Sequence, residues 1–148
     1  MATYLADKSA LVHMKNPNVA AKVAPLIMDG EVATCGVVEL EVLYSARSER
    51  DLAATRAERA AAFPRIAMSE NDFVRAEDVI AQLARRGHHR AVSLPDLLIA
   101  AAAERSQLVV LHYDGDYDVI AAVTGQRVEW VAPEGESLST TGRRYRTV

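Results

Sequence analysis

Short apolar runs and longer amphipathic segments alternate along this chain. The runs are mostly apolar and are bounded by turn residues or charges, which is typical of buried strands. They lie at residues 3–6, 32–34, 65–68, 108–111 and 128–131, with 65–68 the weakest of the set. The run at 108–111 is the clearest strand, because it is fully apolar and partly β-branched.

Between these runs, apolar residues recur at the spacing of one face of a helix. Asn16-Pro17-Asn18 breaks the first helical stretch. Ser69 and Asp72 have capping-box spacing at the start of another helix, and Gly87 follows its end. Ser93 opens a further helix. The predicted helical segments are residues 9–30, 36–47, 51–63, 69–86, 93–103 and 119–123.

This order of strands and helices predicts an α/β fold. Helices separate the strands along the chain, so neighbouring strands can run parallel with helices on both faces of the sheet. We therefore expect a three-layer domain with a mostly parallel central sheet over residues 1–132. Residues 133–148 are rich in Gly, Ser, Thr and Arg, which predicts a mobile tail.

The chain has 148 residues, the length of one ordinary domain, and half of them are apolar, which excludes a disordered chain. Cys35 is the only cysteine, so no disulfide can form within the chain. The first residues lack the apolar core of a signal peptide, and the longest apolar run, residues 97–103, is too short to cross a bilayer. We expect a cytoplasmic protein that does not contact a membrane.

The net charge excludes one way of binding nucleic acid. There are 17 Lys and Arg against 20 Asp and Glu, so the net charge is −3. Proteins that hold nucleic acid by nonspecific attraction to phosphates carry the opposite sign. Nucleic-acid chemistry here needs a local basic patch or a bound cation. Candidates for steering RNA are Arg85, Arg86 and Arg90, and then residues 143–146, although a solvated helix end and a solvated tail explain them equally well.

Five acids lie at strand ends or in the helices that follow strands. Ligands of a parallel α/β sheet gather beyond the carboxyl ends of its strands, so these acids could converge on one rim. Like charges in one cleft repel each other unless a cation lies between them. Oxygen ligands without His or Cys favour Mg²⁺ or Mn²⁺. The five acids are Asp7, Glu41, Asp96, Asp114 and Asp116.

Each acid also has an explanation that needs no metal. Asp7 fits a turn, Asp96 fits a capping box with Ser93, and Glu41 fits a solvated helix position. Residues 114–118 fit a polar turn. The histidines do not have the spacing of zinc ligands, and we interpret them as surface or basic-patch residues; they are His13, His88, His89 and His112.

Four segments resemble the motifs of PIN-domain proteins, and they come in the same order. Leu5-Ala6-Asp7-Lys8-Ser9-Ala10 resembles the opening strand motif, an Asp followed two positions later by Ser or Thr. Glu41-Val42-Leu43-Tyr44-Ser45-Ala46-Arg47 is similar to the helix motif. Pro95-Asp96-Leu97-Leu98-Ile99-Ala100-Ala101-Ala102 is similar to the third and is the most specific, and Leu111-His112-Tyr113-Asp114-Gly115-Asp116-Tyr117 resembles the fourth. The resemblance covers residues 3 to about 132, and small bacterial members of this length are usually VapC-type toxins of toxin–antitoxin pairs.

The resemblance implies a PIN-like fold and a Mg²⁺- or Mn²⁺-dependent endoribonuclease, a hydrolase that cleaves RNA phosphodiester bonds with a metal-activated water. The acids of the family's site match Asp7, Glu41, Asp96 and Asp114, with Asp116 as an additional acid. For direct contact with the metal we expect Asp7, Asp96, Asp114 and Asp116. Ser9 matches a hydroxyl that supports the pocket, and His112 stands where many members have Thr or Ser.

The resemblance further implies an inhibitory VapB-type antitoxin and a homodimer. Val19, Val23 and Leu26 are candidates for the dimer surface, although core positions explain them equally well. Two other functions stay open, a catalytically silent PIN-like binding module and a metal-dependent phosphomonoesterase. Retention of all the acids disfavours the first, and the chain offers no cap or lid segment to support the second.

Overall fold

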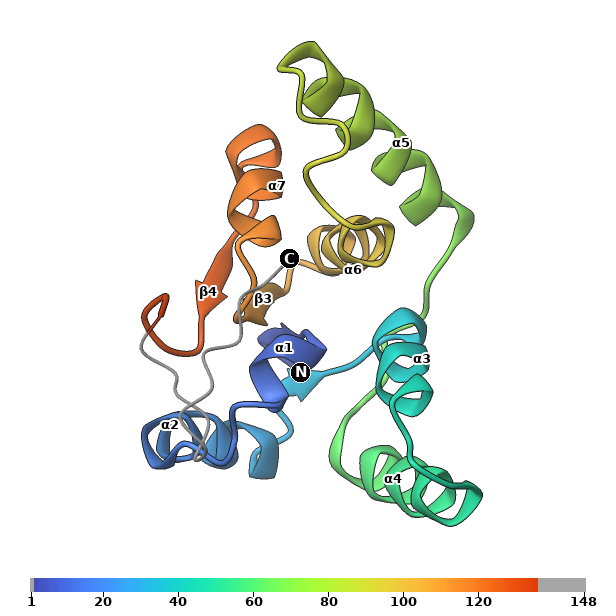
Figure 1. The fold of residues 1–148 in the computed structure, drawn as a ribbon, viewed down its shortest axis with the longest axis vertical. Coiled ribbons are helices and arrows are strands. Elements are labelled where there is room, and N and C mark those ends of the chain that lie inside the picture. Colours follow the sequence, from blue (N-terminus) through green and yellow to red (C-terminus); the bar gives the residue numbers. More distant parts are fainter. Residues whose placement is uncertain (1, 136–148) are drawn as a thin grey trace.

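A computed structural model describes residues 2–135 of the chain. Within that range, four parallel strands form the central sheet in the order β2–β1–β3–β4 (Figure 1). The strands are β1 (Tyr4–Ala6), β2 (Val32–Ala33), β3 (Val109–His112) and β4 (Val128–Trp130). Leu5 of β1 pairs with Ala33 on one side and with Val110 on the other. The carboxyl ends of β1 and β3 therefore lie next to each other at one edge.

Helices cover both faces of this sheet, as the predicted three-layer α/β fold requires (Figure 1). In the described range they are α1 (Lys8–Leu11), α2 (Pro17–Met28), α3 (Gly36–Tyr44), α4 (Glu49–Ala62), α5 (Glu70–Arg85), α6 (Leu94–Arg105) and α7 (Asp116–Thr124). Side chains of α1 and α2 pack against one face, together with Ala6 and Leu111. Those of α3, α5, α6 and α7 pack against the other, with Leu5 and Val110. The alternation of strand side chains thus separates two cores.

Two ion pairs fix the helices that carry the candidate acids. Asp72 closes the predicted capping box with Ser69, and its carboxylate also accepts hydrogen bonds from Arg105 of α6, at 2.7 and 3.1 Å. In the second pair, the Arg59 guanidinium of α4 donates two bonds of 2.8 Å to Glu39 of α3. The first pair fastens α5 to α6, and the second fastens α4 to α3.

The elements follow the predicted order, but the strand expected at residues 65–68 is wrong. Only Arg65 pairs with the sheet, in a single bridge to Thr34. The reason is that β2 ends at once, because Cys35 is already the N-cap of α3. The helix predicted at residues 119–123 begins earlier, at Asp116, and its first turn contains Asp116 and Asp118, whose charges favour a helix N-terminus.

The candidate dimer surface on α2 is also wrong. Val19 and Val23 are fully buried among the residues that cover one face of the sheet, and Leu26 packs against the same core. The large apolar residues that remain exposed on α3 and α5 are instead Leu40, Tyr44, Phe73 and Val74. Helical spacing alone does not tell a core face from a contact face.

No helix within residues 2–135 has both the length and the apolar character needed to span a membrane. Pro133 to Gly135 belong to the described residues, and the Gly135 N–H donates to the Tyr113 hydroxyl at 2.8 Å. The rest of the predicted tail, including residues 143–146, lies outside the described residues.

Candidate metal centre

The site begins where β1 ends. Asp7 follows β1 directly and is the N-cap of α1, with its side chain 4% exposed. Its Oδ2 accepts the Ser9 N–H at 3.1 Å. The Ser9 hydroxyl accepts the N–H of Tyr113, just after β3, at 2.9 Å. Ser9 therefore links the ends of the two central strands and orients Asp7 between them.

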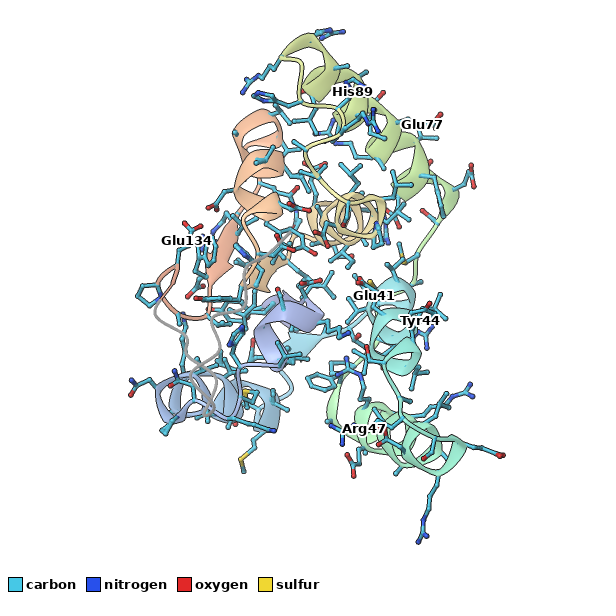
Figure 2. The ribbon with its side chains drawn as sticks, viewed as in Figure 1. Glu41, Tyr44, Arg47, Glu77, His89 and Glu134 are labelled. Atoms are coloured by element: carbon cyan, nitrogen blue, oxygen red, sulfur yellow. The ribbon has the colours of Figure 1, made fainter. Side chains whose placement is uncertain are left out.

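Glu41 and Asp96 approach from the helices on one face of the sheet. Glu41 lies in α3 and is half-buried, whereas Tyr44 at the end of the same helix is exposed (Figure 2). Asp96 lies in the first turn of α6 and is buried. The Ser93 hydroxyl accepts the Asp96 N–H at 3.3 Å, but the Ser93 N–H donates to Asp116 rather than to Asp96. The Asp96 carboxylate therefore does not complete a capping box and is directed to the acids.

Asp114 and Asp116 follow β3. The Asp114 carboxylate accepts the Asp116 N–H at 2.9 Å, and Asp116 Oδ2 accepts the Ser93 N–H at 2.9 Å. These bonds join the β3–α7 turn to the start of α6, which carries Asp96.

The structure brings all five predicted acids together in two overlapping groups. In each group, one carboxylate oxygen per residue lies within 4.8 Å of the others. The first group is Asp7, Glu41 and Asp96, and the second is Asp96, Asp114 and Asp116. Asp96 belongs to both, so it is the centre of the cluster.

Tyr117 joins the cluster from α7, and sequence reasoning missed it. Its side chain is fully buried, and its hydroxyl lies 2.9 Å from Asp7 Oδ1 and 3.2 Å from Asp96 Oδ1. Burial raises the pKa of this phenol well above its usual value, so it stays protonated and donates. A tyrosine in an apolar helix is typical of a core residue, and nothing in the sequence shows that its hydroxyl lies between two acids.

Three of the acids, Glu41, Asp96 and Asp114, resist ionisation in the absence of a cation. Burial raises the pKa of Asp96, and contact with Asp116 and the charge of Asp7 raise it further. Burial is also the main reason that the pKa values of Glu41 and Asp114 are raised. A divalent cation would reverse this balance, because it favours the ionised form of every carboxylate around it.

The donor set fits a hard divalent cation. Every candidate ligand is a carboxylate oxygen, as Mg²⁺ and Mn²⁺ prefer. One oxygen, Glu41 Oε1, is buried and has no hydrogen-bond partner among the described residues. An unsatisfied buried carboxylate oxygen beside other acids is costly, and a bound cation would remove that cost.

The predicted surface position of two histidines is wrong. His13 is 7% exposed and His112 is fully buried, whereas His88 and His89 are exposed. His112 Nδ1 accepts the Asp114 N–H at 3.1 Å, and its ring packs against Tyr117 and Trp130. Burial lowers the pKa of His112 to about 4. The neutral ring therefore supports the backbone at Asp114.

The proposed RNA-steering residues lie apart from the acids. Arg85 and Arg86 are exposed at the end of α5, and Arg90 is exposed in the loop that leads to α6. Figure 2 places His89 in this loop, at the far end of α5. The loop is connected to the site through Ser93 and its bond to Asp116.

A sequence profile of the PIN domain family matches residues 4–123. Among curated proteins, the chain is 41% identical to Ribonuclease VapC21 of Mycobacterium tuberculosis over 132 residues, 89% of this chain and 96% of that protein. It is 43% identical to Ribonuclease VapC51 of the same species over 132 residues, 89% of this chain and 95% of that one.

Among solved structures, a DNA-bound VapBC from Salmonella typhimurium superposes with a TM-score of 0.73 at 20% identity, over 89% of this chain and 100% of that chain. VapBC-5 from M. tuberculosis superposes with a TM-score of 0.58 at 27% identity, over 86% of this chain and 97% of that chain.

Proposed function

This chain belongs to the PIN domain family, and we propose that it is a metal-dependent endoribonuclease acting as the toxin of a toxin–antitoxin pair. One observation carries the proposal: acids from four separate segments converge at one sheet edge, where a divalent cation would stabilise their ionised forms. The names of the relatives, Ribonuclease VapC21 and Ribonuclease VapC51, support RNA as the substrate.

We assign Mg²⁺ or Mn²⁺ to the carboxylates of Asp7, Asp96, Asp114 and Asp116, with Glu41 completing the site. When bound, such a cation offsets the negative charge of a reacting phosphodiester and provides an activated water as the nucleophile. This requirement explains why a nuclease can have an acidic site and a net charge of −3.

The chain's own side chains hold this geometry. The Tyr117 hydroxyl keeps Asp7 and Asp96 directed to a common point, and Ser9 orients Asp7. His112 fixes the backbone N–H of Asp114. These contacts order the acids before substrate arrives, which reduces the reorganisation needed during the reaction.

The similar solved structures are described as VapBC, which supports a VapB-type antitoxin as the inhibitory partner. We place the protein in the cytoplasm, where RNA and such a partner would meet it. Arg85, Arg86 and Arg90 attract RNA from the exposed end of α5.

We further propose a homodimer through the exposed apolar residues of α3 and α5. Tyr44 is 93% exposed and Leu40 is 70% exposed, and a partner subunit would cover both. Leu40→Glu should convert the dimer to a 16.1 kDa monomer in sedimentation, whereas Met28→Glu, at another exposed apolar position, should not. A wild type that sediments only as a monomer at micromolar concentration would exclude a stable dimer.

The direct test is cleavage of a structured RNA by the purified chain. We expect cleavage in Mg²⁺ or Mn²⁺, none in EDTA, and recovery when the metal is restored. Asp114→Asn should lose cleavage, while Asp29→Asn, at an exposed acid at the end of α2, should keep it.

The same assay separates the alternatives. A silent binding module would bind RNA without cutting it. A phosphomonoesterase would release inorganic phosphate from 5′- or 3′-phosphorylated ends and leave the internal bonds intact.

A further inference from the structure

A hollow of about 410 Å³ lies beside the acidic cluster, between α1, the end of α3 and α4. Its lining includes Lys8, which directly follows Asp7 in the sequence, and Val42, which directly follows Glu41. Figure 2 shows Glu41 on α3 and Arg47, another lining residue, where the chain passes toward α4. The acids themselves do not line the hollow, so it is a separate feature.

Two basic side chains in this lining are available to a ligand. The Lys8 ammonium donates to the Ser45 hydroxyl, which leaves two of its three N–H groups for other partners. The Arg47 guanidinium is exposed and makes no hydrogen bond or ion pair with any described residue. Arg59, the third basic residue of the lining, forms an ion pair with Glu39.

Lys8 also connects the hollow to the helix that carries Glu41. The Ser45 hydroxyl, which accepts from the Lys8 ammonium, donates to the Glu41 carbonyl at 3.3 Å. The ammonium group therefore lies beside the turn of α3 that presents Glu41 to the other acids.

The other wall of the hollow is apolar. Leu11 and Val12 of the first helical turn and Val42 of α3 line it, and Val12 is 55% exposed. Cations beside an exposed apolar wall suit a nucleotide, whose phosphates need positive charge and whose base can pack against apolar side chains.

We propose that this hollow is a nucleotide subsite, which binds the RNA nucleotide next to the phosphodiester held at the acids. Lys8 and Arg47 contact its phosphates, and Val12 contacts its base. This inference rests on the proposed ribonuclease function. A protein segment is the competing occupant, but the two available cations, Lys8 and Arg47, favour the polyanion RNA.

RNA binding without cleavage tests the subsite. In an Asp96→Asn background and in EDTA, a fluorescently labelled single-stranded RNA is titrated with protein at several salt concentrations, and its anisotropy is measured. Lys8→Met and Arg47→Met should each weaken binding roughly three- to tenfold and lower the slope of log affinity against log salt by about 0.7. Lys15→Met, at an exposed lysine outside the hollow, should change neither quantity.

Two further variants separate the charge and the apolar wall from simple damage to the fold. Ser45→Ala removes the partner of Lys8 but keeps its charge, so RNA binding should persist. Val12→Asn should weaken binding of RNA but not of inorganic polyphosphate, which has no bases. Equal loss with both ligands would overturn the base contact.

If Lys8→Met and Arg47→Met bind RNA as tightly as Lys15→Met, the subsite is wrong. The same holds if they weaken only the binding of a protein partner. If the wild type cuts no RNA but binds it in a way that depends on Lys8, the proposed function is contradicted and the RNA-binding subsite is supported. If the wild type cuts RNA but its RNA binding does not depend on Lys8, the subsite is wrong and the proposed function is unaffected.

Discussion

Tyr117 shows how much of this site depends on a single atom. Its hydroxyl lies 2.9 Å from Asp7, to which it donates its one proton, and 3.2 Å from Asp96, whose raised pKa keeps a proton for the second contact. The ring is fully buried against His112, so the hydroxyl has no freedom to turn to solvent. One tyrosine therefore holds the acid that follows β1 and the acid in the first turn of α6 at a fixed separation.

Tyr117→Phe keeps the ring and removes this donor. We expect the metal-free protein to lose about 1–3 kcal/mol of unfolding free energy, because buried carboxylate oxygens lose their hydrogen bond. Urea denaturation in EDTA measures the change. Tyr4→Phe, at a half-buried tyrosine in β1, should cost less than about 0.5 kcal/mol. Equal stability of the two variants would mean that the hydroxyl bridge contributes nothing.

The fold and the acids could be predicted from sequence because both follow from short patterns. Apolar runs mark strands, and parallel strands bring their following residues to one edge. The burial of His112, Tyr117 and Val19 could not be predicted, because it depends on which helix packs against which face of the sheet. A histidine inside an apolar run gives no local sign that Tyr117 and Trp130 will enclose it.

The helix that carries Glu41 is held in place by an ion pair that includes none of the five acids. Glu39 lies two residues before Glu41 in α3, and its carboxylate accepts both bonds from Arg59 of α4. The two side chains are only 14% and 10% exposed. Burial alone would raise the pKa of Glu39, but the bonds from Arg59 and Thr34 bring it below its usual value. The pair therefore anchors the helix that presents Glu41.

Arg59→Met should destabilise the protein by about 2 kcal/mol, because Glu39 remains buried without its partner. Arg56→Met changes an exposed arginine of the same helix and should cost little. Urea denaturation of the two variants at neutral pH measures the difference. If Arg56→Met and Arg59→Met unfold at the same urea concentration, the ion pair does not anchor α3.

Two sets of carboxylates make the stability of the protein depend on pH in opposite directions. Glu41, Asp96 and Asp114 have raised pKa values, chiefly through burial. Each binds a proton more tightly when folded, so its contribution to stability falls as the pH rises above the unfolded pKa of about 4. The pKa values of Glu39 and Asp72 are lowered, because burial raises them less than their arginine partners lower them. The stabilisation that these two groups contribute is therefore lost as the pH falls below about 4.

The melting temperature in EDTA should therefore be highest in mildly acidic solution and fall between about pH 5 and pH 8. Mg²⁺ should remove this fall, because the cation replaces the protons that the acids lose. Thermal unfolding across the pH range, in EDTA and in Mg²⁺, measures both curves. Parallel curves under the two conditions would show that the acids and the metal are not coupled.

Thermal unfolding of the wild type and Asp96→Asn, each in EDTA and in Mg²⁺, tests most directly whether the acids form a metal site. Asn keeps the shape of Asp96 and removes an ionisable carboxyl, and with it a metal ligand, from the centre of the cluster. In EDTA the variant should melt at or above the wild-type temperature, because the neutral amide, unlike the buried carboxyl, can never add a negative charge to the cluster. Mg²⁺ should stabilise the wild type more than the variant. A lower melting temperature for the variant in EDTA, with an unchanged response to Mg²⁺, would contradict the site, because Asp96 would then only stabilise the start of α6.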